Sequence, residues 1–367
     1  MHRRDLLKLG AIAGGTFAMG GLTRAWWSTA SAQPAGIPTV DRLVITVAVD
    51  NVYDIFAKGG KLDTITVERA PFARSGNTLL SEHGLAYHLE SFRGSERREI
   101  LLDFALTEGA IAQNYRALRL DPARTDALIL SHGHADHYGA LVSLVDQGTI
   151  KPGLTLYAGG EDTFCQRVVV TPAGQMDMGQ LDRARLESRG VKVVLAKQPT
   201  VVAGHPMTTG QIERLTDFEK PPAAGRLMSG PMDSACASTH FGTTQVAVKP
   251  GELVFDTFQG EHATVYLVKD RGLVVITSCG HAGVVNSVRQ AQKVTGVEKV
   301  HAIVGGFHLA PAPDEIVAKT VTSFKAIKPD YVIPMHCTGL NTIVAVQREM
   351  PAALVMPSTG TRVIFGA

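Results

Sequence analysis

Hydrophobic residues occur in short continuous runs in the first half of the chain, and turn-forming residues separate these runs. Residues 43–49, 85–90 and 100–104 are rich in aliphatic side chains and are bounded by polar or glycine-containing segments. Runs of this length predict buried β-strands. A stretch with helical character around 109–118 leads into a further apolar run, 127–130, which we interpret as another buried strand.

The second half of the chain alternates between strand-like and helix-like runs. We expect strands followed by helices at 272–277 then 284–294, at 300–304 then 315–327, and a last strand at 331–334 before the C-terminal stretch. Each of these predicted strands is followed by a loop that carries a histidine, namely His281, His308 and His336. Functional groups in α/β folds gather where strands end, so these histidines are candidates for one site.

Periodicity weakens between about 159 and 260, where proline and glycine accumulate, as in Lys220-Pro221-Pro222-Ala223-Ala224-Gly225. We interpret this segment as an insertion over the site, within one domain that covers residues 33–367.

The first 32 residues have the order of a secretory signal. Arg3 and Arg4 precede an apolar stretch at 9–22, and Ala30-Ser31-Ala32 supplies small residues for cleavage. Two adjacent arginines before a glycine-rich apolar stretch resemble a twin-arginine-type signal. A membrane anchor is the alternative, but this stretch is shorter than the roughly 20 residues needed to span a bilayer. We therefore predict a signal peptide at 1–32 and a periplasmic or secreted protein.

Removal of the signal changes the charge balance. The full chain has 36 basic and 34 acidic residues, and the signal holds four basic residues and one acidic residue, which leaves 32 and 33 and a net charge of −1. This balance gives no support for nucleic-acid binding or for stable membrane association after cleavage. A small-molecule substrate is the partner that we expect, and the oligomeric state stays open.

Four cysteines, Cys165, Cys236, Cys279 and Cys337, form no Cys-x-x-Cys pair. This spacing argues against a zinc knuckle and against a small disulfide scaffold. Export permits one disulfide without implying it.

The densest group of reactive side chains is His132-Gly133-His134-Ala135-Asp136-His137, directly after the apolar run 127–130. Alternation along an extended chain puts His132 and His134 on one side, and the following turn can direct Asp136 and His137 towards a neighbouring position. One loop can thus supply ligands to two metals. Imidazole and carboxylate ligands suit Zn²⁺ and also Mn or Fe.

This run matches the His-x-His-x-Asp-His signature of the metallo-β-lactamase superfamily, which the chain resembles over most of its length after the signal. The resemblance implies an α/β fold, a four-layer αβ/βα sandwich with a binuclear metal site at one edge. It also implies that Asp103, which follows the aliphatic residues 100–102, organises the metal loop.

Carried over residue by residue, the resemblance implies two divalent metal ions, with Zn²⁺ expected and Mn or Fe as alternatives. The first metal would be held by His132, His134 and His281, and the second by Asp136, His137 and His336. Cys279 stands where many members place a bridging aspartate or cysteine, so it is a further candidate for metal contact. His308 is a candidate substrate contact or proton donor, with metal ligation as the alternative.

A closer resemblance is to the subgroup that includes dihydropterin-methyl-ribofuranosyl-aminobenzene-phosphate synthase. The stretches that carry it are Asp50-Asn51, Glu82-His83-Gly84-Leu85, Thr277-Ser278-Cys279-Gly280-His281-Ala282-Gly283, Gly305-Gly306-Phe307-His308-Leu309 and Pro334-Met335-His336-Cys337-Thr338-Gly339. In the insertion, residues 208–214 and Phe218-Glu219 resemble subgroup positions that face the pocket. We carry over the fold and the metal site but not the reaction, because the synthase belongs to a cytoplasmic pathway and this chain is predicted to be exported.

The predicted reaction is hydrolysis of an ester, lactone, amide or phosphodiester by a metal-activated hydroxide, because two metals can lower the pKa of water and polarise the substrate. Asp136 would orient the nucleophile as well as ligate, and His308 would assist. The alternatives are a synthase-like transferase, a metal-dependent oxidoreductase on the same fold, and a non-catalytic periplasmic binder.

Overall fold

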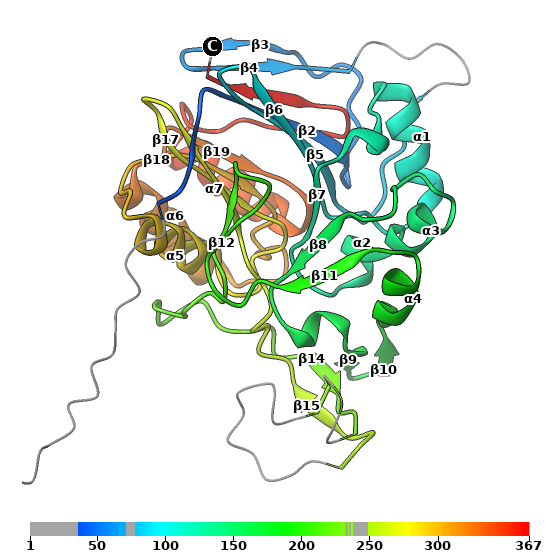
Figure 1. Ribbon diagram of the computed structural model, residues 1–367. Coiled ribbons are helices and arrows are strands. Elements are labelled where there is room, and N and C mark those ends of the chain that lie inside the picture. The colour runs from blue at the N-terminus through cyan, green and yellow to red at the C-terminus, as the bar shows by residue number, and fades with distance from the viewer. Residues whose placement is uncertain (1–35, 71–77, 232–233, 235, 238–248, 367) are drawn as a thin grey trace, which may run out of the picture. The chain divides into compact units, whose positions relative to one another are not determined.

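The computed structural model describes residues 36–70, 78–231, 234, 236–237 and 249–366. Pro34–Ala367 form one compact unit, in which two large β-sheets pack face to face and helices cover both outer faces (Figure 1). This architecture confirms the predicted four-layer αβ/βα sandwich. The predicted signal peptide lies outside the described residues.

The first sheet has nine strands within the described residues, in the order β11-β8-β7-β6-β5-β2-β20-β4-β3. Its central strands pair antiparallel from β20 to β6 and parallel from β6 to β11. The bounds are β2 Arg42–Val49, β3 Gly60–Leu62, β4 Ile65–Glu68, β5 Ala86–Arg93, β6 Glu96–Leu102, β7 Ala127–Leu130, β8 Thr155–Ala158, β11 Lys192–Leu195 and β20 Arg362–Phe365.

The second sheet has seven strands within the described residues, in the order β12-β13-β16-β17-β18-β19, and β1 pairs with β16. Strands β17, β18 and β19 run parallel, so their carboxyl ends lie at one edge of the sheet. The bounds are β1 Thr39–Val40, β12 Thr200–Val201, β13 Met207–Thr208, β16 Thr264–Val268, β17 Gly272–Thr277, β18 Val300–Gly305 and β19 Tyr331–Pro334.

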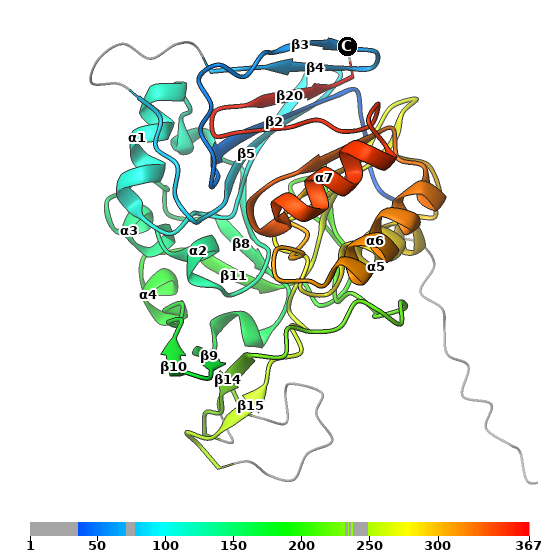
Figure 2. The same cartoon turned by 180° about the vertical axis from the view of Figure 1, so that it is seen from behind.

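Seven α-helices of the described residues flank the sheets. The bounds are α1 Glu108–Leu118, α2 Ala135–Tyr138, α3 Leu141–Asp146, α4 Arg183–Ser188, α5 Val284–Thr295, α6 Asp314–Ile327 and α7 Leu340–Glu349. Figure 2 shows α5, α6 and α7 together on the outer side of the second sheet, whereas α1 to α4 lie beside the first. No helix of the described residues has both the length and the apolar character needed to cross a membrane.

The layered packing explains why the strands read as continuous apolar runs. In β7, Ala127 and Ile129 point into the core between the two sheets, whereas Leu128 and Leu130 point into the core beneath α1 and α3. Successive side chains of a strand point to opposite faces, so a strand with helices on one side and a sheet on the other buries both faces. Each fully buried aliphatic side chain contributes about 1.5–3 kcal/mol.

Part of the segment predicted as an insertion, residues 159–260, lies in the two large sheets. Strand β11 pairs with β8 and strand β13 pairs with β16. The rest forms a separate small sheet with the strand order β10-β9-β14-β15, at the lower end of the view in Figure 1. Its bounds are β9 Arg167–Thr171, β10 Gly174–Asp177, β14 Gly225–Met228 and β15 Leu253–Phe255. A disulfide between Cys165 and Cys236 links two parts of this region.

Candidate metal centre

The loop between β7 and α2 is held in place by Asp103, which is fully buried directly after β6. One carboxylate oxygen of Asp103 accepts a hydrogen bond from the backbone N–H of Ser131 at 2.9 Å. The other accepts from the Ser131 hydroxyl at 2.8 Å and from Nδ1 of His137 at 2.7 Å. Asp103 has a φ of 59°, a strained conformation for a residue with a Cβ, and such strain is typical of functional sites. The geometry agrees with the organising role that the resemblance implies.

Arg167, at the start of β9, braces the same loop from the other side. Its buried guanidinium donates to the backbone carbonyl of Gly133 at 3.0 Å and pairs with Asp256 at 2.9 Å. Glycine is needed at 133 because a Cβ there would lie 2.2 Å from the Thr163 carbonyl oxygen. Arg167 could not be predicted from the sequence, because a lone arginine in an irregular segment resembles a solvated side chain.

Three imidazoles form the first ligand group. The ring centroids of His132, His134 and His281 lie 4.7 to 4.8 Å from one another. Burial lowers the pKa of each ring, and neighbouring imidazoles and the Arg167 guanidinium lower it further. The three rings are therefore neutral, which is the form in which histidine binds a metal.

Asp136, His137 and His336 form the second ligand group. Nε2 of His336 lies 3.2 Å from Nε2 of His137 and 3.3 Å from a carboxylate oxygen of Asp136. Burial would raise the pKa of Asp136, but His137 and His336 outweigh this effect and lower it, so Asp136 is a carboxylate. For His137, burial acts to lower the pKa, but the carboxylates of Asp136 and Asp103 raise it to about 9.

Hydrogen bonds to Nδ1 of three of the candidate ligand histidines determine that Nε2 is the ring nitrogen directed towards the metal position. Nδ1 of His137 donates to Asp103, and Nδ1 of His336 lies 3.1 Å from Oδ1 of Asn51. Nδ1 of His132 lies 2.9 Å from the Ser131 hydroxyl, which itself donates to Asp103 and so accepts from the ring. Nε2 of His132 and of His336 is then left with a lone pair for a cation, and a metal at Nε2 of His137 would displace the proton that its raised pKa retains there.

These donors fit divalent metal ions. Ligands about 2.1 Å from a tetrahedral metal lie about 3.4 Å apart, which matches the spacings between His336 and its two neighbours in the second group. In the first group, Nε2 of His132 and both ring nitrogens of His281 are buried without a hydrogen-bond partner. Unpartnered buried nitrogen atoms are costly, and metal ligation would satisfy those with a free lone pair.

Cys279, two residues after the end of β17, lies between the two groups. Its thiol belongs to one cluster of potential ligand atoms with His132 and His281 and to another with His137 and His336, and its Sγ is 3.2 Å from Nε2 of His137. The structure therefore places Cys279 within reach of both ligand groups. Cys337, which the sequence analysis did not single out, has its Sγ 3.3 Å from that of Cys279.

His308 faces a cavity beside the first ligand group. The cavity has a volume of about 690 Å³, and His134, His281 and His308 all line it. The His308 ring centroid is 4.1 Å from that of His281, and Nδ1 of His308 has no hydrogen-bond partner. This position suits contact with a bound substrate, although His308 also forms a possible ligand cluster with Cys279 and Cys337.

Residues in or next to the middle segment, 159–260, position His281. Phe258 stacks on its ring at a centroid distance of 4.1 Å, and the buried carboxylate of Glu261 accepts from the backbone N–H groups of His281 and Ala282. Arg214 donates to the carbonyl oxygen of His281 at 3.0 Å. The sequence did not predict that Phe258, Glu261 and Arg214 would contact His281, because loop contacts of this kind leave no periodic pattern.

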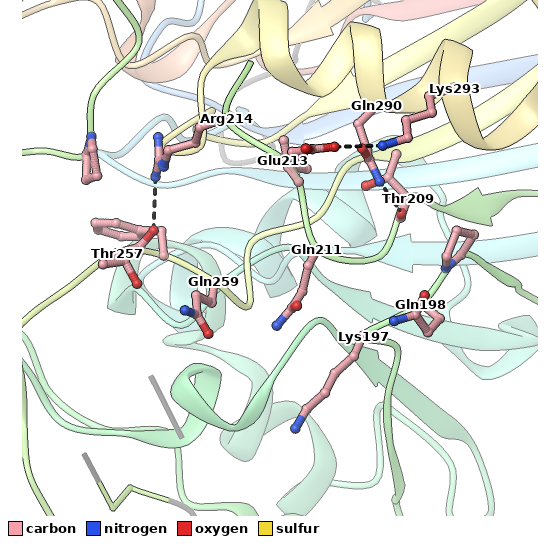
Figure 3. A pocket seen from close by; sticks show the side chains of 14 residues that line it. Lys197, Gln198, Thr209, Gln211, Glu213, Arg214, Thr257, Gln259, Gln290 and Lys293 are labelled. Carbon is pink, nitrogen blue, oxygen red and sulfur yellow. Dashed lines mark hydrogen bonds and ion pairs between the residues drawn. The ribbon is translucent and has the colours of Figure 1, made fainter. Parts of the chain in front are cut away.

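Arg214 and Phe258 also line a second hollow of about 570 Å³, which is polar in character (Figure 3). Arg214 reaches the Thr257 carbonyl oxygen there at 3.0 Å, and Lys293 pairs with Glu213 at 2.7 Å. The predicted pocket-facing segment 208–214 therefore contributes to this hollow, whereas Phe218 and Glu219 line the cavity beside the metal ligands.

Three other histidines take supporting positions. His83 is largely exposed, stacks on His336 and lies 3.3 Å from Asp136. His262 is buried with Nε2 2.8 Å from the Leu130 carbonyl oxygen, and His205 bonds the Ser91 hydroxyl. The contacts of His262 and His205 are those of packed core residues.

An αβ/βα sandwich with a His-x-His-x-Asp-His loop and late histidines at one sheet edge defines the metallo-β-lactamase fold. The family model described as the metallo-beta-lactamase superfamily matches residues 92–164, which include the whole metal loop. The chain is therefore similar to this superfamily in the segment that carries its metal loop, and it has the same fold.

Individual proteins show more specific similarities to the chain. The chain is 27% identical over 287 residues to 7,8-dihydropterin-6-methyl-4-(beta-D-ribofuranosyl)-aminobenzene-5'-phosphate synthase of Methanocaldococcus jannaschii, covering 76% of this chain and 90% of the relative. It is 22% identical to the uncharacterized protein MJ0448 of the same organism, covering 72% of this chain and 87% of the relative. A solved structure, Tm1679, described as a metal-dependent hydrolase of the beta-lactamase superfamily, aligns with a TM-score of 0.63 at 21% identity, covering 87% of this chain and 98% of that one. The last alignment shows the same fold.

Proposed function

We propose that the protein is a metal-dependent hydrolase that cleaves an ester, lactone, amide or phosphodiester bond. The observation that carries this proposal is that two ligand groups lie side by side with Cys279 between them, and that His134 and His281 of the first group line a cavity that His308 also faces. A protein that only binds a ligand would not need the His308 imidazole, whose Nδ1 has no hydrogen-bond partner, on the cavity wall beside the metal ligands.

His132, His134 and His281 would hold one metal, and Asp136, His137 and His336 the other, with Cys279 in contact with either. Two divalent metals in such a site lower the pKa of a bound water and polarise the oxygen of the bond to be cleaved. The metal that we expect is Zn²⁺, because imidazole, carboxylate and thiolate donors together suit it.

The side chains supply orientation and proton handling. The Asp136 carboxylate, with its lowered pKa, can accept a hydrogen bond from the attacking water. His308 can donate a proton to the leaving group: burial lowers its pKa, but a hydrogen bond to Cys337 and the negative charge of that side chain outweigh this and raise the pKa above the usual histidine value. Asp103, Arg167 and Glu261 hold the ligand-bearing loops in position.

The test is turnover by protein loaded with Zn²⁺, measured on chromogenic esters, lactones, phosphodiesters and a β-lactam. We expect at least one of these classes to be cleaved, and we expect His134→Ala to abolish that cleavage while the melting temperature stays within a few degrees of wild type after Zn²⁺ is added. Cleavage that survives unchanged in metal-free protein would contradict the proposal.

A second candidate is transferase chemistry like that named for the Methanocaldococcus jannaschii relative. The coverage of 90% of that relative favours it. Formation of the compound in the relative's name, from a dihydropterin with a leaving group on its methyl carbon and a ribofuranosyl-aminobenzene phosphate, with release of that group and a proton, distinguishes it from hydrolysis and is measured by mass spectrometry.

We also propose that the protein is exported through its twin-arginine-type signal and works in the periplasm or outside the cell. The Cys165–Cys236 disulfide supports this location, because structural disulfides persist mainly in oxidising compartments. Both tryptophans, Trp26 and Trp27, belong to the proposed signal. Mass spectrometry of periplasmic protein should therefore detect a chain that begins after Ala32, and an intact Trp26 in that material would contradict export with cleavage.

A further inference from the structure

The cavity beside the candidate metal ligands has mainly apolar walls. Apart from the imidazoles and two charged residues, most of its described lining is aliphatic, aromatic, glycine or proline. Examples from four separate segments are Val169, Phe218, Phe307, Leu309 and Ile316. A volume of about 690 Å³ lies within the range of roughly 300–1,000 Å³ that is common for small-molecule sites.

The two charged lining residues are poorly placed to bind an anion. Glu219 is buried, and its carboxylate already accepts hydrogen bonds from the backbone N–H groups of Val285 and Asn286, each at 2.8 Å. Lys220 is exposed at the rim. The described part of the lining therefore lacks the cluster of arginines and lysines that phosphate recognition usually requires.

The N-termini of the two helices near the cavity, α5 and α6, are also unsuited to binding an anionic ligand. The N-terminus of a helix attracts anions through its free N–H groups and its dipole. At α5, the Glu219 carboxylate already accepts hydrogen bonds from the N–H groups of the helix N-terminus. At α6, Asp314 and Glu315 occupy the first turn, so they complement the helix dipole themselves and repel a ligand anion.

We propose that the site takes a neutral ester or lactone whose apolar acyl or aryl group is seated against Phe218, Phe307 and Ile316, with the bond to be cleaved beside His281 and His308. The inference rests on the proposed hydrolase function and names its substrate class. In the reaction the oxygen of one water bonds to the acyl carbon, and the carbon–oxygen bond to the alcohol breaks with its electron pair on the alcohol oxygen. That oxygen takes one proton, and the acid leaves as a carboxylate with release of another.

The first measurement is the kcat/KM of the Zn²⁺-loaded protein on 4-nitrophenyl acetate, butyrate, hexanoate and octanoate. Each buried methylene contributes about 0.8 kcal/mol, so we expect kcat/KM to rise about 3- to 4-fold per added methylene until the cavity is filled. The phosphate monoester 4-nitrophenyl phosphate should be a poor substrate. A kcat/KM that is independent of acyl length, or higher on the phosphate than on every ester, overturns the inference and leaves hydrolase function intact.

The matched variants are Ile316→Glu, which places a carboxylate on the cavity wall, and Ala318→Glu, which adds the same group to an exposed position of α6. Ile316→Glu should lower kcat/KM on the octanoate at least 10-fold more than on the acetate, whereas Ala318→Glu should follow wild type. Equal effects of the two variants overturn the inference.

Binding of the neutral apolar dye Nile red separates the two proposals. We expect wild type and Ala318→Glu to bind the dye with enhanced fluorescence, and Ile316→Glu to bind it at least 10-fold more weakly. Dye binding with this pattern but no turnover of any ester contradicts the hydrolase function while the apolar site stands. A dimer that Ile316→Glu dissociates, with no change in ester preference, would assign the cavity walls to a second copy of the chain and overturn the inference.

Discussion

Asp136 combines two tasks in the proposed hydrolysis: its carboxylate lies against His336 of the second ligand group, and it would orient the attacking water. Asparagine keeps an oxygen ligand and a similar volume but removes the charge. We expect Asp136→Asn to lower kcat about 10²-fold or more, as for loss of a general base, with a smaller change in KM. Asp63→Asn, at an exposed turn between β3 and β4, is the control. Wild-type kcat in Asp136→Asn with two metals bound would contradict this role.

His308 is expected to act on the substrate and not on the metals. His308→Ala should retain both metals by elemental analysis and lose about 10²-fold in kcat/KM, the range for a positioned proton donor. His336→Ala should lose metal under the same conditions, because it removes a ligand of the second group. If His308→Ala loses metal to the same extent as His336→Ala, His308 is a ligand and the assignment is wrong.

Asp50 gives a pH-dependent prediction for the metal-free protein. Burial raises the pKa of this carboxyl from 3.8 to about 6, against hydrogen bonds such as that from the His336 N–H. A raised pKa means that the contribution of Asp50 to stability is complete below about pH 4 and is lost as the pH rises through about 6. Urea unfolding should therefore show Asp50→Asn gaining about 2–3 kcal/mol relative to wild type between pH 4 and pH 7. If the difference in unfolding free energy between Asp50→Asn and wild type does not change with pH, the raised pKa of Asp50 is contradicted.

Among individual residues, the sequence predicts those that share one short loop and misses those that converge from afar. His132, His134, Asp136 and His137 are recognisable because four potential ligands fall within six residues. Cys337 lies 58 positions from Cys279, and their contact depends on β17 and β19 ending at the same sheet edge. Spatial neighbours of this kind leave no local spacing pattern.

Among the elements, long apolar runs were predicted well. The predicted strands at 127–130, 272–277 and 331–334 coincide with β7, β17 and β19, and the predicted helix at 315–327 differs from α6 by one residue. Burial on both faces makes such runs conspicuous. The hairpin of β3 and β4 was missed, because β3 is fully exposed and its sequence has no apolar run.

The small sheet of β9, β10, β14 and β15 should depend on its disulfide. Cys165 belongs to a small apolar cluster with Leu227 and Val254, and the bond to Cys236 spans 71 residues of sequence. Cys165→Ser combined with Cys236→Ser should lower the free energy of unfolding by about 2–4 kcal/mol, measured by urea denaturation. Cys279→Ser with Cys337→Ser is unsuitable as a control, because these thiols lie among the metal ligands, so oxidised and reduced wild type provide the comparison. Equal stability of all forms would contradict a structural contribution.

In the molecule as a whole, the order of strands and helices predicted an α/β fold, and the resemblance carried by the His132–His137 loop implied its four-layer form. The path of the middle segment could not be predicted, because residues 159–260 contribute strands to both large sheets and to a small third sheet. The packing of Phe258 and Arg167 against the metal loop follows from that shared path. Sequence patterns describe local periodicity, and this arrangement is set by long-range contacts.

Turnover during metal titration tests the central claim most directly. Protein freed of metal by a chelator, and then dialysed, is given increasing Zn²⁺ while cleavage of 4-nitrophenyl butyrate is followed. Because two ligand groups lie side by side and the first lines the cavity, we predict negligible turnover without metal and a rise that levels off at two equivalents. Full turnover in the presence of excess chelator, or no turnover of this or any other tested substrate with two equivalents bound, would contradict the account of a two-metal hydrolase.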